Sequence, residues 1–334
     1  MLDHVFPRRC LAVVATAAAA LVTATVANAQ TPNPQLLRTY QPVMVFDKTE
    51  QFRPASVQSF IADSVLERLD GGSWTVVDPD PEPGDLPGPG TGTWRLNQES
   101  CNPASALGGL SCYADAAASG SGASTVYARV VRLENAIVLQ YWFFYYDDVY
   151  TYFYPLHPFV NMLWQAHEGD WEVVNVVLSA DEQPLEVGYS QHCLGQRRGW
   201  ETTPRVDDTH PVVYVATGSH ANYLSPGVHP FDRRCVPPPV IGLLEQNRLP
   251  LPNDFAGGDG AVAGPKAAGG ELTTIKHVDE ETPTWLSFPG SWGEAQYFHS
   301  PQTGAVALGT SPVGPAYHEV WVDPLGTLAA WPAG

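Results

Sequence analysis

The chain has 334 residues, with 17 basic and 35 acidic side chains and a formal net charge of −18 at pH 7. A surface this acidic repels phosphate backbones, which excludes nucleic-acid binding, and it is not attracted to anionic membranes. It is compatible with cations and with neutral or zwitterionic partners.

The first 29 residues have the pattern of a signal peptide. Arg8 and Arg9 precede an apolar run over residues 11–26, and Ala27-Asn28-Ala29 gives the small-x-small pattern of a cleavage site. We expect cleavage after about Ala29 and a secreted, extracellular mature chain. The apolar run is too short and too rich in alanine to remain as a membrane span.

Four cysteines follow the predicted cleavage site, and an even number in an exported chain predicts two disulfides. Three pairings are open, and we prefer the local pairs Cys101–Cys112 and Cys193–Cys235 because both bridge loop-like sequence. The chain contains no C-x-x-C spacing, which disfavours a thiolate zinc site.

In chain order, the first expected elements are a strand over residues 40–46 and a helix over residues 54–69, where apolar residues recur at roughly helical spacing. Residues 78–93 form a polar loop rich in proline and glycine. This loop is too short to require a domain boundary.

The centre of the chain predicts an antiparallel hairpin. Residues 126–133 and 136–146 are apolar arms around Glu134-Asn135, and the second arm is strongly aromatic. Residues 171–178 and 211–216 have the composition of two further core strands.

The remaining sequence predicts one surface excursion and two closing strands. Residues 226–270 are dominated by proline, glycine and alanine, and residues 285–292 and 316–322 are expected to close the sheet. We therefore predict a single, mainly β domain over residues 30–334. Its architecture is a β-sandwich with long loops and a small helical layer.

The sequence H-E-G-D-W-E at residues 167–172 concentrates one imidazole and three carboxylates before a buried strand. Ionised carboxylates beside a hydrophobic core need a cationic partner. No lysine or arginine lies between Arg132 and Arg197, so a divalent cation is the simplest local source of positive charge.

In an extended strand, Glu168, Asp170 and Glu172 alternate onto one face, and His167 adds a nitrogen ligand. An oxygen-rich site with one histidine suits Ca²⁺ or Mg²⁺, and also Mn²⁺, better than structural zinc. Two alternatives stay open: a hydrogen-bonded turn, and a metal-free acid/base pair of carboxylates.

Two further segments could contribute to this site. G-S-H-A-N-Y at residues 218–223 follows a core strand and presents His220 on a sharp turn. His220 could be a general base, a group that orients a ligand, a further ligand, or only a turn residue. The Asp147-Asp148 pair ends the aromatic strand, and one of the two could reach the site or both could lie in a solvated turn.

These motifs, with Y-Q-P-V at residues 40–43, Q-Y-W-F-F at 140–144 and P-G-S-W-G at 289–293, occur in the order that resembles the vacuolar protein sorting-associated protein 62 family. The resemblance covers roughly residues 38–295. The sorting name of the family implies little about biochemistry.

A more distant resemblance is to the necrosis-inducing NLP cytolysins, which carry an aromatic strand ending in Asp and an H-x-x-D-W-E motif. It implies a β-sandwich with a cation held by Asp147, His167, Asp170 and Glu172. This chain departs from the cytolysins at Glu168-Gly169, where they have Arg-His, and its loop after Asp147 is longer.

Three functions are therefore expected. The first is a binding module, cytolysin-like in its resemblance, whose cation contacts a glycan or lipid headgroup at an outer membrane surface. The second is a metal-dependent hydrolase of a glycoside or phosphoester, with Glu168 or His220 as base. The third is a purely structural cation. The sequence leaves the choice between an enzyme and a binding protein open, as it does the oligomeric state.

Overall fold

The computed structural model describes residues 34–98, 101, 115, 124–150, 165–236, 238–246, 248, 250–294, 297–300, 304–307 and 310–334. The predicted signal peptide over residues 1–29 lies outside this part of the chain. The division into a signal peptide and one domain stays a prediction.

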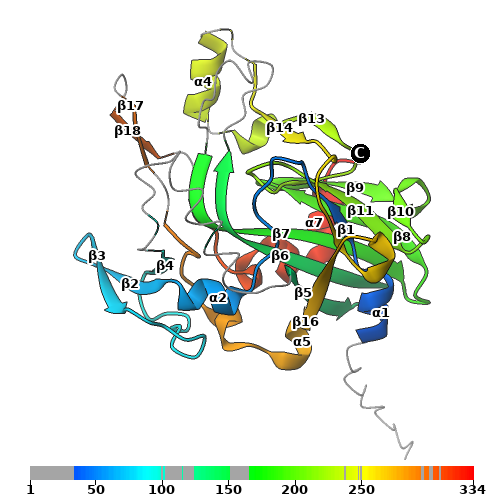
Figure 1. Cartoon of the computed structure of the whole chain (residues 1–334), viewed down its shortest axis with the longest axis horizontal. Helices are drawn as coiled ribbons and strands as arrows, with labels where there is room; N and C mark the ends of the chain where they lie inside the picture. The colour runs from blue at the N-terminus through cyan, green and yellow to red at the C-terminus, as the bar shows by residue number, and fades with distance from the viewer. Residues whose placement is uncertain are drawn as a thin grey trace, which may run out of the picture. The chain divides into compact units, whose positions relative to one another are not determined.

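Most of the described strands form one large mixed sheet (Figure 1). Among the described strands, only the pairs β1–β11, β15–β16 and β16–β5 are parallel. The prediction of a mainly β protein is confirmed. In spatial order the sheet contains β10 (Arg205–Val206), β11 (His210–Val215), β1 (Val43–Val45), β15 (Val262–Gly264), β16 (Glu271–His277), β5 (Ser124–Arg132), β6 (Ala136–Tyr150), β7 (Gln165–Ser179), β8 (Pro184–Gln191) and β9 (Leu194–Gly199), and β12 (Asn222–Tyr223) pairs with β11.

The described residues also form three smaller sheets. They are β3 (Ser73–Asp78), β2 (Val65–Asp70) and β4 (Trp94–Asn97); β13 (Gly227–Pro230) and β14 (Asn253–Ala256); and β17 (Tyr297–Ser300) and β18 (Gly304–Ala307).

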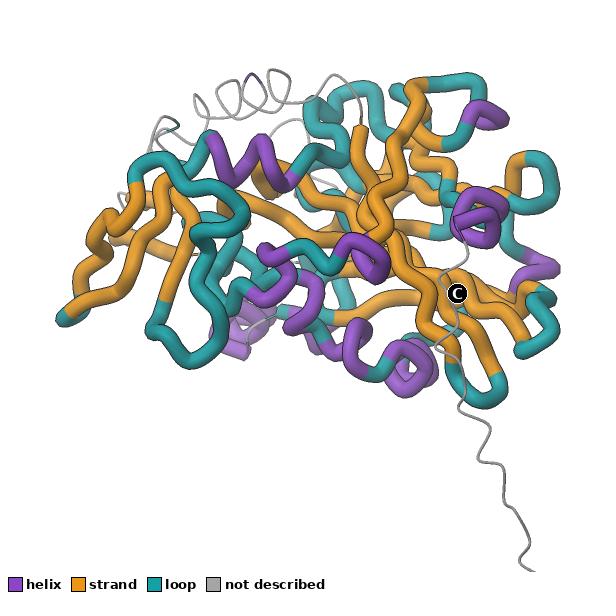
Figure 2. Tube along the Cα trace, turned by 90° about the horizontal axis from the view of Figure 1, so that it is seen from below, coloured by secondary structure: helices purple, strands orange, loops and turns teal. Residues whose placement is uncertain are grey.

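Short helices lie around the strands, as Figure 2 shows, and they form the predicted small helical component. The described α-helices are α1 (Pro34–Thr39), α2 (Val57–Ala62), α4 (Pro238–Gln246), α5 (Val278–Glu281), α6 (Glu319–Val322) and α7 (Pro324–Ala330). The described 3₁₀ turns are η2 (Trp200–Thr202), η3 (Arg233–Cys235), η4 (Lys266–Ala268), η5 (Thr284–Ser287) and η6 (Pro315–Tyr317). None of the helices in this part of the chain is long and apolar enough to cross a bilayer.

The predicted central hairpin is confirmed and extends further than expected. β5 and β6 pair from Arg132 and Ile137 at the turn to Val126 and Phe143. β6 then pairs with β7 along nearly its whole length. This pairing brings the end of the aromatic strand opposite the H-E-G-D-W-E motif.

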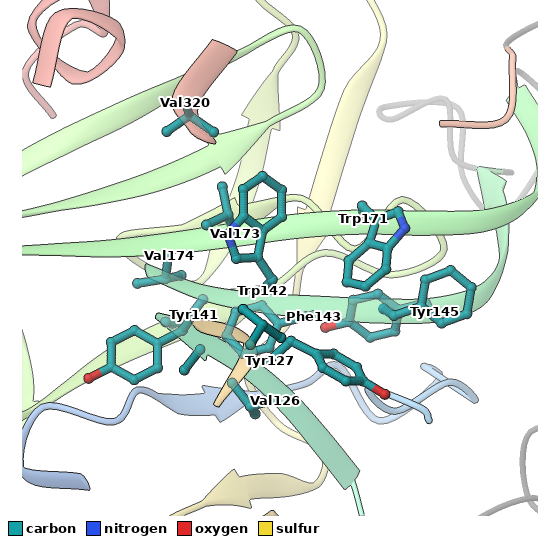
Figure 3. Close-up of a cluster of buried hydrophobic side chains, with 14 of the residues drawn as sticks. Val126, Tyr127, Tyr141, Trp142, Phe143, Tyr145, Trp171, Val173, Val174 and Val320 are labelled. Atoms are coloured by element: carbon teal, nitrogen blue, oxygen red, sulfur yellow. The ribbon is translucent and has the colours of Figure 1, made fainter. Parts of the chain in front are cut away.

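Aromatic side chains of these strands make much of the core. Trp142 and Trp171 come from β6 and β7, and their ring centroids lie 6.4 Å apart (Figure 3). Trp171 stacks on Trp285 at 5.8 Å and meets the edge of Trp292 at 5.4 Å. Burial of such large rings contributes strongly to the stability of this sheet.

Three predicted elements differ from the observed ones. The helix predicted over residues 54–69 ends at Ala62, because Val65 starts strand β2, which pairs with both β3 and β4. Residues 285–292 and 316–322 were expected as strands, but they contain η5 and α6. Their tryptophans pack on the core from short helical segments and a bend, so an apolar pattern alone did not identify their conformation.

The loop predicted over residues 78–93 is present between β3 and β4. The excursion predicted over residues 226–270 contains β13, α4 and β14, but it does not stay outside the main sheet. Its segment Val262–Gly264 is strand β15, which pairs with β1 and β16. This strand is short and follows a glycine-rich stretch, so its sequence gives little strand signal.

The predicted disulfide Cys193–Cys235 is present, with Cα atoms 5.4 Å apart. Cys101 is also disulfide-bonded. Its preferred partner, Cys112, lies outside the described residues. Disulfides are typical of proteins that fold in an oxidising compartment.

Candidate metal centre

The pairing of β6 with β7 places two acidic segments side by side. Asp148 lies opposite His167, Asp147 lies opposite Glu168, and Tyr145 lies opposite Asp170. Directly opposed residues of antiparallel strands have neighbouring side chains. The site is therefore built on two long paired strands (Figure 1).

Gly169 interrupts the alternation of side chains along β7. Its φ of +61° is left-handed, and a Cβ atom here would lie 1.8 Å from the carbonyl oxygen of Trp292. Only glycine fits this position. Because of this interruption, the prediction that Glu168, Asp170 and Glu172 share one face of the strand is wrong. Glu168 contacts a different part of the protein from Asp170 and Glu172.

A group of three buried residues can hold a metal ion. Asp148, His167 and Asp170 each offer one ligand atom, and these atoms all lie within 4.8 Å of one another. The His167 Nδ1–H donates to the carbonyl of Gly169 at 2.8 Å, since a carbonyl can only accept. Its Nε2 lies 3.4 Å from Asp148 Oδ2 and is the nitrogen left for a metal. Metal-binding histidines commonly have their other ring nitrogen fixed in this way.

The structure places Asp148 in this group, where the resemblance to the cytolysins implied Asp147. Both oxygens of Asp147 are buried without a hydrogen bond to any described residue. Burial, followed by the neighbouring Glu168, raises the pKa of Asp147 well above its usual range. The distortion at Gly169 accounts for the presence of His167 beside Asp170, because strict alternation would place these two side chains on opposite faces of β7.

Glu172 lies beside the group rather than in it. Its carboxylate accepts from the Ser190 hydroxyl, and from Asn222 Nδ2 at 3.4 Å. Burial raises the pKa of Glu172 well above its usual range, and the nearby Asp170 adds to this effect. Glu172 is therefore close enough to Asp170 for the two carboxylates to repel each other.

His220 contacts the carboxylate of Asp170. It is fully buried in a left-handed turn, with φ at +52°, between β11 and β12. Its Nδ1 lies 3.1 Å from Asp170 Oδ2, and its ring stacks on Tyr145 at 3.9 Å. Of the roles considered for His220, the geometry favours that of a group that orients a ligand.

Glu50 completes this arrangement, and nothing in the sequence marked it. Glu50 Oε1 lies 3.6 Å from His220 Nε2, and its two oxygens accept from the backbone N–H groups of Phe52 and Gly218, each at 2.7 Å. Burial opposes the charged form of His220, but Glu50, with Asp170, raises its pKa to about 10. Part of the positive charge that the carboxylates need therefore comes from His220.

Glu168 has a structural position. Its Oε2 accepts from the backbone N–H groups of Gln98 at 3.1 Å and Glu294 at 3.0 Å, which ties β7 to two distant segments. The hydrolase hypothesis used Glu168 or His220 as base. Both side chains are occupied by buried partners, so this geometry does not favour that hypothesis.

No known protein-family profile matches the chain. Vacuolar protein sorting-associated protein 62 of Saccharomyces cerevisiae is 26% identical over 171 residues, which are 45% of this chain and 35% of the yeast protein. The yeast protein TDA6, also named for vacuolar protein sorting, is 27% identical over 191 residues, or 50% of this chain and 37% of its own length. The chain resembles vacuolar protein sorting-associated protein 62. It spans little more than a third of the length of these relatives.

Among solved structures, the crystal structure of necrosis and ethylene inducing protein 2 from the causal agent of witches' broom disease of cocoa is similar. The TM-score is 0.32 and the identity is 16%, over 59% of this chain and 71% of the other. The expected resemblance to vacuolar protein sorting-associated protein 62 is therefore found, at low identity.

Proposed function

We propose that this chain is a secreted protein that binds a divalent cation through Asp148, His167 and Asp170 and recognises a glycan or lipid headgroup through that cation. The observation that carries the proposal is the buried group of three ligand atoms within 4.8 Å of one another. Secretion is inferred from the signal-peptide pattern of residues 1–29 and from the disulfides.

The chemistry of the ligand set favours Ca²⁺ or Mg²⁺, with Mn²⁺ as a further candidate. Two carboxylates and one imidazole supply mostly hard oxygen ligands. Three protein ligands leave coordination positions of such a cation for other oxygen atoms. Hydroxyl groups of a sugar and phosphate oxygens of a lipid headgroup are ligands of this kind.

The acidic surface supports a role for the cation in recognition. With a formal charge of −18, the protein itself repels anionic headgroups, and a bound cation supplies local positive charge. Binding to such a headgroup should therefore require the metal.

Flotation with neutral phosphatidylcholine vesicles, with and without glycolipid or anionic lipid, tests the proposal together with a glycan array. We expect binding in Ca²⁺, Mg²⁺ or Mn²⁺ that is lost in chelator and in Asp170→Asn. Binding that is unchanged by the chelator, or no cation-dependent binding to any surface, would overturn the proposal.

A further inference from the structure

The Cys193–Cys235 disulfide joins the β8–β9 turn to η3 across a separation of 42 residues. Cys193 is exposed and Cys235 is half-buried. The bond is therefore within reach of a dithiol reductant in solution. Exposed disulfides are more often labile than buried ones.

The residue before Cys193 is held in an unfavourable conformation. His192 has a φ of +53°, in the left-handed region, which costs a non-glycine residue free energy unless its surroundings compensate. Its Nε2 lies 2.7 Å from Asp254 Oδ2, and its ring lies 3.9 Å from that of Phe231. The disulfide fixes the turn in which His192 makes these contacts.

Asp254 links His192 to the turn that contains His220. It is fully buried on β14, and it accepts hydrogen bonds from Ser219 Oγ at 2.7 Å and from Tyr223 Oη at 2.5 Å. Ser219 directly precedes His220, which contacts the metal ligand Asp170. Polar contacts between residues adjacent to the disulfide, on β14 and in the His220 turn therefore link the disulfide to the metal centre.

We propose that the Cys193–Cys235 disulfide is a redox switch for the cation affinity of the metal centre. This inference rests on the proposed function, because it requires that the centre binds a cation. A dithiol reductant gives two electrons and two protons to the disulfide. Two cysteine thiols form, the S–S bond between them breaks, and the reductant closes its own disulfide.

Reduction releases the β8–β9 turn from η3. His192 can then relax from its left-handed conformation and leave Asp254, which loses its imidazole partner. The turn of residues 218–223 is then less firmly held, and so is His220. Loss of groups that orient metal ligands commonly lowers metal affinity by about 10- to 100-fold. We expect about a 10-fold loss, because the disulfide acts through several contacts.

A second disulfide complicates a simple reduction experiment, because Cys101 is also disulfide-bonded. The double variant Cys193→Ser/Cys235→Ser removes only the proposed switch. Calorimetric titrations with Ca²⁺, Mg²⁺ and Mn²⁺ would compare this variant with the wild type, each after removal of metal, with and without dithiothreitol.

The expected result is cation binding about 10-fold weaker than that of oxidised wild type, both for reduced wild type and for the double variant without dithiothreitol. Addition of dithiothreitol to the double variant should not change its affinity further. Equal affinity of oxidised and reduced wild type would overturn the switch while leaving the proposed function intact. No binding by oxidised wild type would overturn both.

If the double variant does not fold, stepwise reduction of the wild type replaces it. Mass spectrometry of alkylated samples then shows which cysteines are reduced at each affinity. A loss of cation affinity that accompanies reduction of Cys193 and Cys235 supports the switch. A loss that accompanies reduction of Cys101 alone contradicts it.

Discussion

His220 Nδ1 lies 3.1 Å from Asp170 Oδ2, although 50 residues separate the two in the chain. This contact joins the two most distinctive motifs of the sequence. Asn222 adds a second link, since its side-chain amide donates to Glu172 at 3.4 Å. The G-S-H-A-N-Y turn therefore serves to hold the carboxylates of the H-E-G-D-W-E strand.

The first prediction concerns the metal affinity of His220→Gln. Without the imidazole, Asp170 loses the group that orients it, and the affinity for the preferred cation should fall about 10- to 100-fold. Calorimetric titration of the metal-free variant measures this loss. His210→Gln is the matched control, because His210 contacts the carbonyl of Gln41 rather than the metal centre. An unchanged affinity in His220→Gln would remove the orienting role.

The second prediction concerns stability against pH in the metal-free protein. The pKa of His220 is about 10 in the folded state and 6.5 as its ordinary value, so its stabilising effect is complete below pH 6.5 and is lost as the pH rises through about 10. His167 acts in the same direction, because Asp148 raises its pKa to about 9 although burial opposes this.

Melting temperatures of the metal-free protein should therefore decrease between pH 6.5 and 10. At the acid end, His220 keeps the pKa of Glu50 low against the effect of burial, so this contribution is lost as the pH falls below about 4.5. The variant His220→Gln should show a smaller alkaline decrease. A flat alkaline profile in the wild type would contradict the assigned charges.

The third prediction concerns Gly169→Ala. The new methyl group would overlap the carbonyl oxygen of Trp292, and the left-handed backbone adds strain. We expect a loss of at least about 2 kcal/mol in the free energy of unfolding. Gly199→Ala is the control, because nothing lies within 4 Å of its added Cβ and its φ is negative. Equal stability of the two variants in urea would show that the bend at Gly169 is not required.

Much of this arrangement was predictable from the sequence. The alternation and aromatic content of residues 126–146 and 171–178 identified the central strands, because periodicity is a local property. The concentration of charge at residues 167–172 beside a buried strand indicated where the candidate metal centre lies. His167 and Asp170 both lie in the group that can hold a metal.

The sequence did not predict in the same way that Asp148, rather than Asp147, lies in the group that can hold a metal. Strict alternation assigns faces correctly only while the backbone stays extended, and the left-handed Gly169 depends on the close approach of Trp292 from a distant segment. Glu50 was missed for a related reason. Its position beside His220 depends on long-range packing, and its own sequence surroundings carry no motif.

The decisive comparison is between Asp148→Asn and Asp147→Asn. Calcium, magnesium and manganese would be titrated into each metal-free variant and into wild type, with thermal melting to confirm folding. We predict at least about a 100-fold loss of affinity for Asp148→Asn. Affinity within a few-fold of wild type is expected for Asp147→Asn, because that carboxylate is not one of the three residues whose ligand atoms lie within 4.8 Å of one another. Loss of binding in Asp147→Asn with normal binding in Asp148→Asn would contradict the assignment, and no stoichiometric cation in wild type would contradict the metal centre itself.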